Sequence, residues 1–206
     1  MKSTTSHAWR SRSVTFITLW IIANATSGFL IGFLENNGLQ FAATIGLTGA
    51  IVGSLQWMVL RYVRMSLIVY GLGWWPLLSA LGWTLTIVAL SIGQGLYYAQ
   101  IAAFSSQLNF PEASWSVVIW MLWVLGMVIA QSRLLQSRFL LAWLLASSIG
   151  SLVQILAARS LCSAICPVLP TALFGLTDAA GWALYGAATG LILLSFQAKL
   201  SQERYQ

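Results

Sequence analysis

The stretch Gly49–Gln56 reads GAIVGSLQ, and a near copy of it, GFLIGFLE, occupies Gly28–Glu35. Both copies follow the pattern G-x3-G-x-L-[E/Q] in an almost wholly apolar context. In a helix, positions i, i+4 and i+7 share one face, so Gly49, Gly53 and Gln56 form one stripe, which Gly46 extends backward. Such a stripe lets two helix backbones approach closely and adds one hydrogen-bonding group, which predicts a helix–helix contact inside a membrane.

The composition of the whole chain supports a membrane environment. Of 206 residues, 59% are hydrophobic and only 7% are charged, whereas a soluble domain carries about 25% charged residues. About 20 apolar residues make one helical crossing of a bilayer. The uncharged runs predict an all-α integral membrane bundle, one domain over 1–206, with six transmembrane helices at about 13–34, 39–60, 74–98, 115–132, 139–157 and 178–197.

The distribution of basic residues predicts the orientation. With both termini in the cytoplasm, nine of the ten Lys and Arg residues fall on the cytoplasmic side, and only Arg159 falls outside. This agrees with the positive-inside rule. The net charge of +6 is therefore an orientation signal and does not indicate a nucleic-acid partner. We expect a cytoplasmic rim that anchors the topology and could hold anionic lipid head groups, formed by Arg61, Arg64, Arg133, Arg138 and Lys199.

Odd- and even-numbered predicted helices carry two different motifs, and this alternation predicts three related helical hairpins. Odd-numbered helices carry W-x3-[N/S]-x2-[S/G], and even-numbered helices carry G-x3-[G/A]. The predicted packing positions are Gly28, Gly32, Gly46, Gly49, Gly53, Gly126, Ala130, Gly186 and Gly190. GFLIGFLE and GAIVGSLQ fall in opposite leaflets, so each must meet a different neighbour. Ordinary close packing explains these stripes, and a contact with an outside partner or a lipid-like ligand is the alternative.

Few residues offer chemistry inside the membrane. Asn24, Gln56 and Gln154 are the predicted intramembrane polar groups, and a buried amide usually bonds another helix. Asp178 fits the first turn of the last helix as a cap. If that helix began near Pro170 instead, Asp178 would lie within the membrane and become the leading functional candidate.

Two further features leave alternatives open. Cys162 and Cys166 fall on an outer loop, where they either form a disulfide or remain free thiols facing lipid. The abundant tryptophans fit an aromatic belt. A bound pigment is the alternative, with a weak axial ligand from Asn24, Gln56, Gln94 or Gln154.

Two segments carry a resemblance to known sequences. QWMVLRYVR (56–64) and GWWPLLSALGW (73–83) resemble a Q-W-x2-L-R … W-W-x3-S-x2-G-W pattern of multi-pass membrane proteins of unknown activity, found mostly in cyanobacteria and similar bacteria. The third predicted hairpin departs from it, because Leu193 stands where Gln56 stands in the first. The resemblance implies a small bacterial protein of the cytoplasmic or thylakoid membrane, and it implies no substrate.

The expected function is therefore non-catalytic. The sequence shows no nucleophile–base pair and no metal-ligand set, and its one histidine, His7, lies in the N-terminal tail. We expect a subunit, scaffold or assembly partner of a membrane complex, or a homo-oligomer, with no catalytic residues and no metal. The alternatives are a small transporter or channel, or a binder of an apolar ligand such as a pigment, quinone or lipid.

Overall fold

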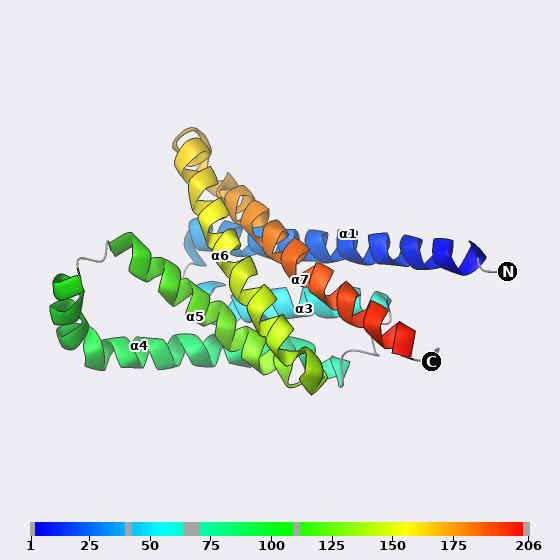
Figure 1. The fold of residues 1–206 in the computed structure, drawn as a ribbon. Helices are drawn as coiled ribbons and strands as arrows, with labels where there is room; N and C mark the ends of the chain where they lie inside the picture. Colours follow the sequence, from blue (N-terminus) through cyan, green and yellow to red (C-terminus); the bar gives the residue numbers. More distant parts are fainter. Residues whose placement is uncertain (1–2, 40–42, 64–70, 109–111, 204–206) are drawn as a thin grey trace.

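The protein is a bundle of long helices in a computed structural model that describes residues 3–39, 43–63, 71–108 and 112–203 (Figure 1). Within these ranges the structure contains no β-strand. The α-helices are α1 (Ser3–Leu34), α3 (Thr48–Tyr62), α4 (Trp75–Leu108), α5 (Glu112–Ser132), α6 (Leu140–Ile165) and α7 (Gly175–Glu203). Short π- or 3-10-helical turns join them, namely η1 (Glu35–Leu39), η2 (Ala43–Leu47), η3 (Leu72–Trp74), η4 (Ser137–Phe139), η5 (Cys166–Val168) and η6 (Thr171–Leu173).

The helices run alternately up and down, and their main contacts close into a ring. Going around that ring, α1 packs on α3, α3 on α4, α4 on α5, α5 on α6, α6 on α7, and α7 on α1. Figure 1 shows that α1 begins and α7 ends at the same end of the bundle, which we call the termini end. The first and last helices of the chain are thus direct neighbours in space.

Local chemistry explains where α1 stops. The side-chain amides of Asn36 and Asn37 donate to the carbonyl oxygens of Gly32 and Phe33, at 2.7 Å each. These carbonyls lie in the last turn, where no further backbone N–H is available to them. Gly38 follows with φ of 93°, a conformation that favours glycine. The chain therefore turns at Asn36–Gly38.

Within the described residues, four helical segments are long and apolar enough to cross a membrane, namely Arg12–Leu39, Leu72–Ile92, Ser137–Val168 and Thr171–Leu200. The α3 helix has only 15 residues, and the apolar part of α5, Ile119–Ser132, is also short. The predicted single helix after residue 74 is present as α4, and it continues to Leu108 instead of ending near 98. Figure 1 shows that the last part of α4 turns sharply away from its first part.

Other predicted spans also differ from the observed helices. The second helix does not begin at 39, because its α-helical part starts at Thr48 after the π-helical turn η2. The Thr48 hydroxyl donates to the Ala43 carbonyl at 2.9 Å and supports this wider turn. The helix expected over 139–157 runs to Ile165, and the last helix begins at Gly175 instead of 178.

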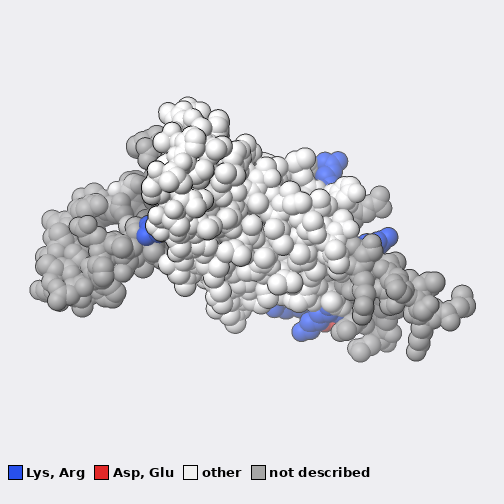
Figure 2. Space-filling view, turned by 90° about the horizontal axis from the view of Figure 1, so that it is seen from above, with Lys and Arg blue, Asp and Glu red and all other residues white. Residues whose placement is uncertain are grey.

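The distribution of side chains is that of a membrane protein. Large apolar side chains on the outer faces of α4 and α6 are exposed, including Leu85, Ile92, Leu141 and Ile149. The interior instead contains tryptophans together with uncharged polar side chains. The described Lys and Arg side chains lie toward the ends of the molecule, and the surface between them is almost free of charge (Figure 2). A surface of this kind suits lipid better than water.

Candidate functional site: a buried amide network

Gln56 on α3 is the centre of a buried hydrogen-bond network. Its Nε2 donates to Asn24 Oδ1 on α1 at 3.0 Å. Its Oε1 accepts two bonds of 3.1 Å, one from Trp75 Nε1 on α4 and one from Gln131 Nε2 on α5. Gln131 Nε2 also donates to Ser79 Oγ at 2.9 Å. A single amide therefore links four helices, and each of these side chains is fully buried.

The network continues from α1 to α7. The Asn24 amide donates to the Trp20 carbonyl at 2.8 Å, and Trp20 Nε1 donates to Thr189 Oγ1 at 3.0 Å. The Thr189 hydroxyl in turn donates to the Tyr185 carbonyl at 2.8 Å. The bonded groups are amides, indoles and hydroxyls, and none of them carries a charge. The arrangement can fix helices against one another, and it contains no side-chain pair arranged as a nucleophile and a base.

Glycines bring these polar groups within reach of each other. A Cβ built at Gly49 would lie 2.5 Å from the Ser79 carbonyl oxygen and 3.0 Å from Ala80 Cα, so only glycine allows α3 to approach α4 this closely. At Gly53 the added atom would meet the Ser79 side chain. The GAIVGSLQ stripe therefore packs on α4 and places Gln56 beside Trp75.

The GFLIGFLE stripe has a different neighbour. A Cβ at Gly28 would lie 2.7 Å from the Asp178 carbonyl oxygen, and one at Gly32 would lie 2.7 Å from Gly175 Cα, both on α7. On the other side of the same contact, Gly186 and Gly190 of α7 lie against Asn24 and Trp20 of α1. The two copies of the motif thus contact different helices, as the sequence predicts.

The small-residue stripe on α5 packs against α4. One predicted member of the α3 stripe, Gly46, is wrong. Gly126 and Ala130 pack against Gly82 on α4. Gly46 is exposed, and a Cβ added there would meet no atom within 4 Å. It lies in η2, whose π-helical turn rotates it away from the face that Gly49 and Gly53 share. The predicted packing positions other than Gly46 meet neighbours within this chain.

The remaining polar candidates, Gln154 and Asp178, lie outside this network. Gln154 on α6 is buried, and its Oε1 accepts a 2.7 Å bond from Trp120 Nε1 on α5. Asp178 is half-buried in the first turn of α7 and packs against Gly32. The amide oxygens of Asn24, Gln56 and Gln154 all accept hydrogen bonds from protein groups, and the side chain of Gln94 lies outside the described residues.

Four members of the predicted basic rim lie at the termini end. Arg61, Arg133, Arg138 and Lys199 are exposed, and Arg64 lies outside the described residues. Arg61 stacks over the Trp57 ring at 5.3 Å. Arg138 forms a 2.7 Å ion pair with Glu203, in which both side chains are more than 40% exposed. Arg159, near the last turns of α6, lies at the opposite end.

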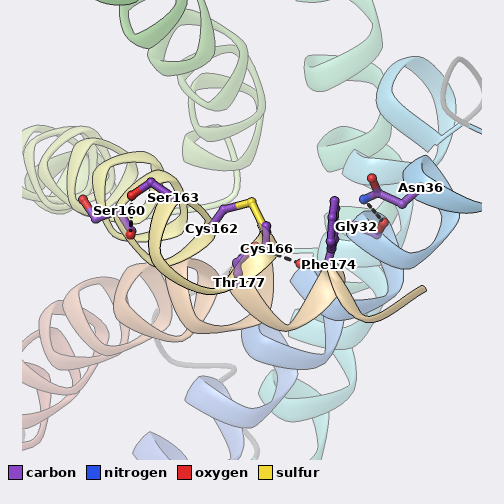
Figure 3. The surroundings of a disulfide bond; sticks show 8 residues. All are labelled: Gly32, Asn36, Ser160, Cys162, Ser163, Cys166, Phe174 and Thr177. Carbon is purple, nitrogen blue, oxygen red and sulfur yellow. Dashed lines mark hydrogen bonds between the residues drawn. A yellow bond between two sulfur atoms is a disulfide. The ribbon is translucent and has the colours of Figure 1, made fainter. Parts of the chain in front are cut away.

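The two cysteines form a disulfide at that opposite end. Cys162 in α6 is bonded to Cys166 in η5, beside the first turn of α7 (Figure 3). The bond closes the end of α6 just before the chain turns through Pro167 and Pro170. Of the two alternatives that the sequence leaves open, the structure has the disulfide.

Sequence reasoning missed five members of the network: Trp20, Trp75, Ser79, Gln131 and Thr189. Trp75 and Ser79 stand in the W-x3-[N/S] motif, which by itself predicts related hairpins and does not identify hydrogen-bond partners. Gln131 directly follows Ala130, and an uncharged polar residue in that position is the signal that could have found it. No protein-family model, curated protein sequence or solved structure matches this chain.

Proposed function

We propose that this protein is a non-catalytic, multi-pass membrane protein that acts as a subunit or assembly partner of a larger membrane complex. In this proposal all six α-helices cross the bilayer, as three related hairpins, with both termini in the cytoplasm of a bacterial cell. The membrane is the cytoplasmic or the thylakoid membrane. The observation that carries the proposal is the interior, which is occupied by uncharged groups bonded to one another across five helices.

The ring order supports six crossings. The α3 helix lies between α1 and α4, and α5 lies between α4 and α6, so each short helix has a long apolar helix on both sides. A helix packed between two membrane-spanning helices lies at the same depth in the bilayer as they do. The turn η2 extends α3 to 20 residues over Ala43–Tyr62, which at about 1.5 Å per residue spans about 30 Å.

Two independent features support the orientation. Basic residues gather at the termini end, which the positive-inside rule assigns to the cytoplasm. The Cys162–Cys166 disulfide lies at the other end, and disulfides persist in compartments outside the reducing cytoplasm. Both features favour the same orientation, with the termini end in the cytoplasm and the disulfide end outside it.

The interior favours a structural role over transport. Ion and proton pathways use ionisable side chains that face the bundle centre or a water-filled cavity. The described Lys and Arg side chains, by contrast, are all exposed, and Asp178 lies at the end of the α1–α7 contact. Because the packing glycines already meet neighbours within the chain, the surface available to a partner is the apolar outside of the bundle.

Cross-linking from defined faces tests this role. A photoreactive amino acid at Leu85 on α4 or at Leu145 on α6, both exposed, should capture one defined membrane protein from at least one face. That protein should also copurify in mild detergent at a fixed ratio. Lipid adducts alone at both positions, with no copurifying protein, would contradict the proposal.

Reconstitution tests the transporter alternative directly. The purified chain in liposomes should take up no solute. Solute uptake that is lost in Asp178→Asn and kept in Glu203→Gln, a matched change at an exposed carboxylate, would replace the proposed role with transport. Copurification of a pigment, quinone or lipid at one per chain, without a protein partner, would favour the ligand-binding alternative.

A further inference from the structure

Three tryptophans occupy related positions in the bundle, and their hydrogen bonding differs. Trp20, Trp75 and Trp143 each precede a buried Asn or Ser by four residues and are all fully buried. Trp20 Nε1 donates to Thr189, and Trp75 Nε1 donates to Gln56. Trp143 Nε1 has no hydrogen-bond partner within the part of the chain that the structure describes.

The Asn or Ser four positions after each tryptophan differs in hydrogen bonding in the same way. Asn24 donates to the Trp20 carbonyl, and Ser79 donates to the Trp75 carbonyl at 2.6 Å. Ser147, which follows Trp143, is 1% exposed, and its Oγ is unpartnered among the described residues. Two polar groups are therefore free on α6 at positions whose counterparts on α1 and α4 are bonded.

A third free group approaches from α7. The Tyr185 hydroxyl is fully buried and lies near Ser147 Oγ, and neither oxygen has a hydrogen-bond partner that meets the distance and angle limits among the described residues. A Cβ added at Gly150, one turn beyond Ser147, would lie 3.2 Å from the Tyr185 ring, so the ring lies against this face of α6. The hydroxyls of Ser147 and Tyr185 thus lie at one α6–α7 contact, and Trp143 lies one turn before Ser147 on the same side of α6.

A free acceptor lies on the neighbouring helix. Gln131 of α5 uses its Nε2 for Gln56 and Ser79, while its buried Oε1 is unpartnered within the described residues. Gln131 and Trp75 share Gln56 Oε1 as acceptor, and the Trp75 ring packs edge-on against Trp143 at 6.1 Å. Gln131 and Trp143 are therefore both neighbours of Trp75: Gln131 shares an acceptor with the Trp75 indole, and Trp143 contacts its ring.

We propose that Trp143, Ser147 and Tyr185, with Gln131 on the α5 side, bind a small uncharged molecule through a hydroxyl group. A hydroxyl accepts from the indole N–H and both donates to and accepts from the two side-chain hydroxyls. Water is the smallest such molecule, and a small alcohol presents the same group. Leaving a buried polar group unpaired costs about 1–3 kcal/mol, and buried polar sites commonly hold ordered water with about three hydrogen bonds. A charged molecule does not fit, because no described ionisable side chain other than Tyr185 belongs to the site.

Hydroxyl-radical footprinting of the wild-type full chain tests this site, with radicals generated by a short X-ray pulse in oxygen-18 water. Trp20 and Trp75 are matched internal controls, since both are as deeply buried as Trp143. A bound water places the radical source against the ring, so Trp143 should be labelled faster than either control. Equal labelling of the three tryptophans would overturn the proposal, and this comparison needs no variant.

Variants and a competing alcohol sharpen the result. Ser147→Ala combined with Tyr185→Phe should reduce Trp143 labelling to the level of Trp75, whereas Ser27→Ala, a change at a buried serine of α1 that bonds only the Ala23 carbonyl, should leave it unchanged. Unchanged labelling in the double variant would count against the site. Oxygen-18 incorporated at Trp143 and unaffected by added glycerol assigns the site to water, and protection of Trp143 alone by glycerol assigns it to an alcohol.

Discussion

Gln56 Nε2 donates to Asn24 Oδ1 over 3.0 Å, joining residues that are 32 positions apart on α1 and α3. Each side chain is fully buried, and each bonds a second partner on a tryptophan: Asn24 bonds the Trp20 carbonyl, and Gln56 accepts from the Trp75 indole. This pair connects the two halves of the network. It also shows how helices that lipid alone would not hold together acquire a fixed arrangement.

Replacing Gln56 should therefore be more harmful than replacing another buried amide. Gln56→Leu removes bonds to Asn24, Trp75 and Gln131, whereas Gln154→Leu removes only the bond from Trp120. At about 0.6–2 kcal/mol for each bond inside a membrane, Gln56→Leu should lose about 2–6 kcal/mol and Gln154→Leu about 1 kcal/mol. Thermal melting in mild detergent measures both. Equal melting temperatures would mean that the network does not stabilise the bundle.

Replacing either of two nearby glycines by alanine should change the stability of the protein by different amounts. Gly49→Ala forces a methyl group against the backbone of α4 at Ser79 and Ala80, so we expect a loss of about 1–3 kcal/mol. Gly46→Ala meets open space and should be close to neutral. The two changes are chemically identical and only three residues apart. A Gly46→Ala variant as unstable as Gly49→Ala would contradict the π-helical displacement of Gly46.

The proposed topology predicts opposite labelling at the two ends. Asn37 and Ser137 are both exposed. Asn37 lies in η1 directly after α1, and Ser137 lies in η4 between α5 and α6, so the two turns are at opposite ends of the bundle (Figure 1). A membrane-impermeant maleimide added to intact cells should reach Asn37→Cys and miss Ser137→Cys, and permeabilised cells should show both. The native cysteines are bonded to each other and leave the background unlabelled. Labelling of Ser137→Cys alone in intact cells would reverse the orientation.

The disulfide should contribute only modestly to stability. It closes a loop of very few residues, and chain-entropy arithmetic for such a loop gives about 2 kcal/mol at most. Cys162→Ser combined with Cys166→Ser should therefore lower the melting temperature slightly and leave the protein folded. Mass spectrometry after alkylation should find two labelled cysteines only when the protein has been reduced. Two alkylated cysteines without reductant would mean that the thiols are free in the cell.

The sequence by itself determined the class of this protein. Its scarcity of charge requires an apolar solvent, and the long uncharged runs require helices, because only a helix satisfies its own backbone groups in lipid. The glycine stripes and the amides Asn24, Gln56 and Gln154 could be recognised because small and polar residues are the means by which membrane helices associate. The basic residues predicted which end of the bundle would carry the positive charge.

Only the tertiary structure decided which helix each stripe contacts. Gly28 and Gly32 pack on α7, the far end of the chain, and a small-residue stripe carries no record of its partner. Gln131 and Thr189 became members of the network only because the ring brings α5 and α7 beside α3 and α1. Gly46 left the stripe because one π-helical turn rotated it away. In lipid, a stripe makes a helix able to pack closely at one face, but the complementary shapes and hydrogen bonds of all the helices together select its neighbour.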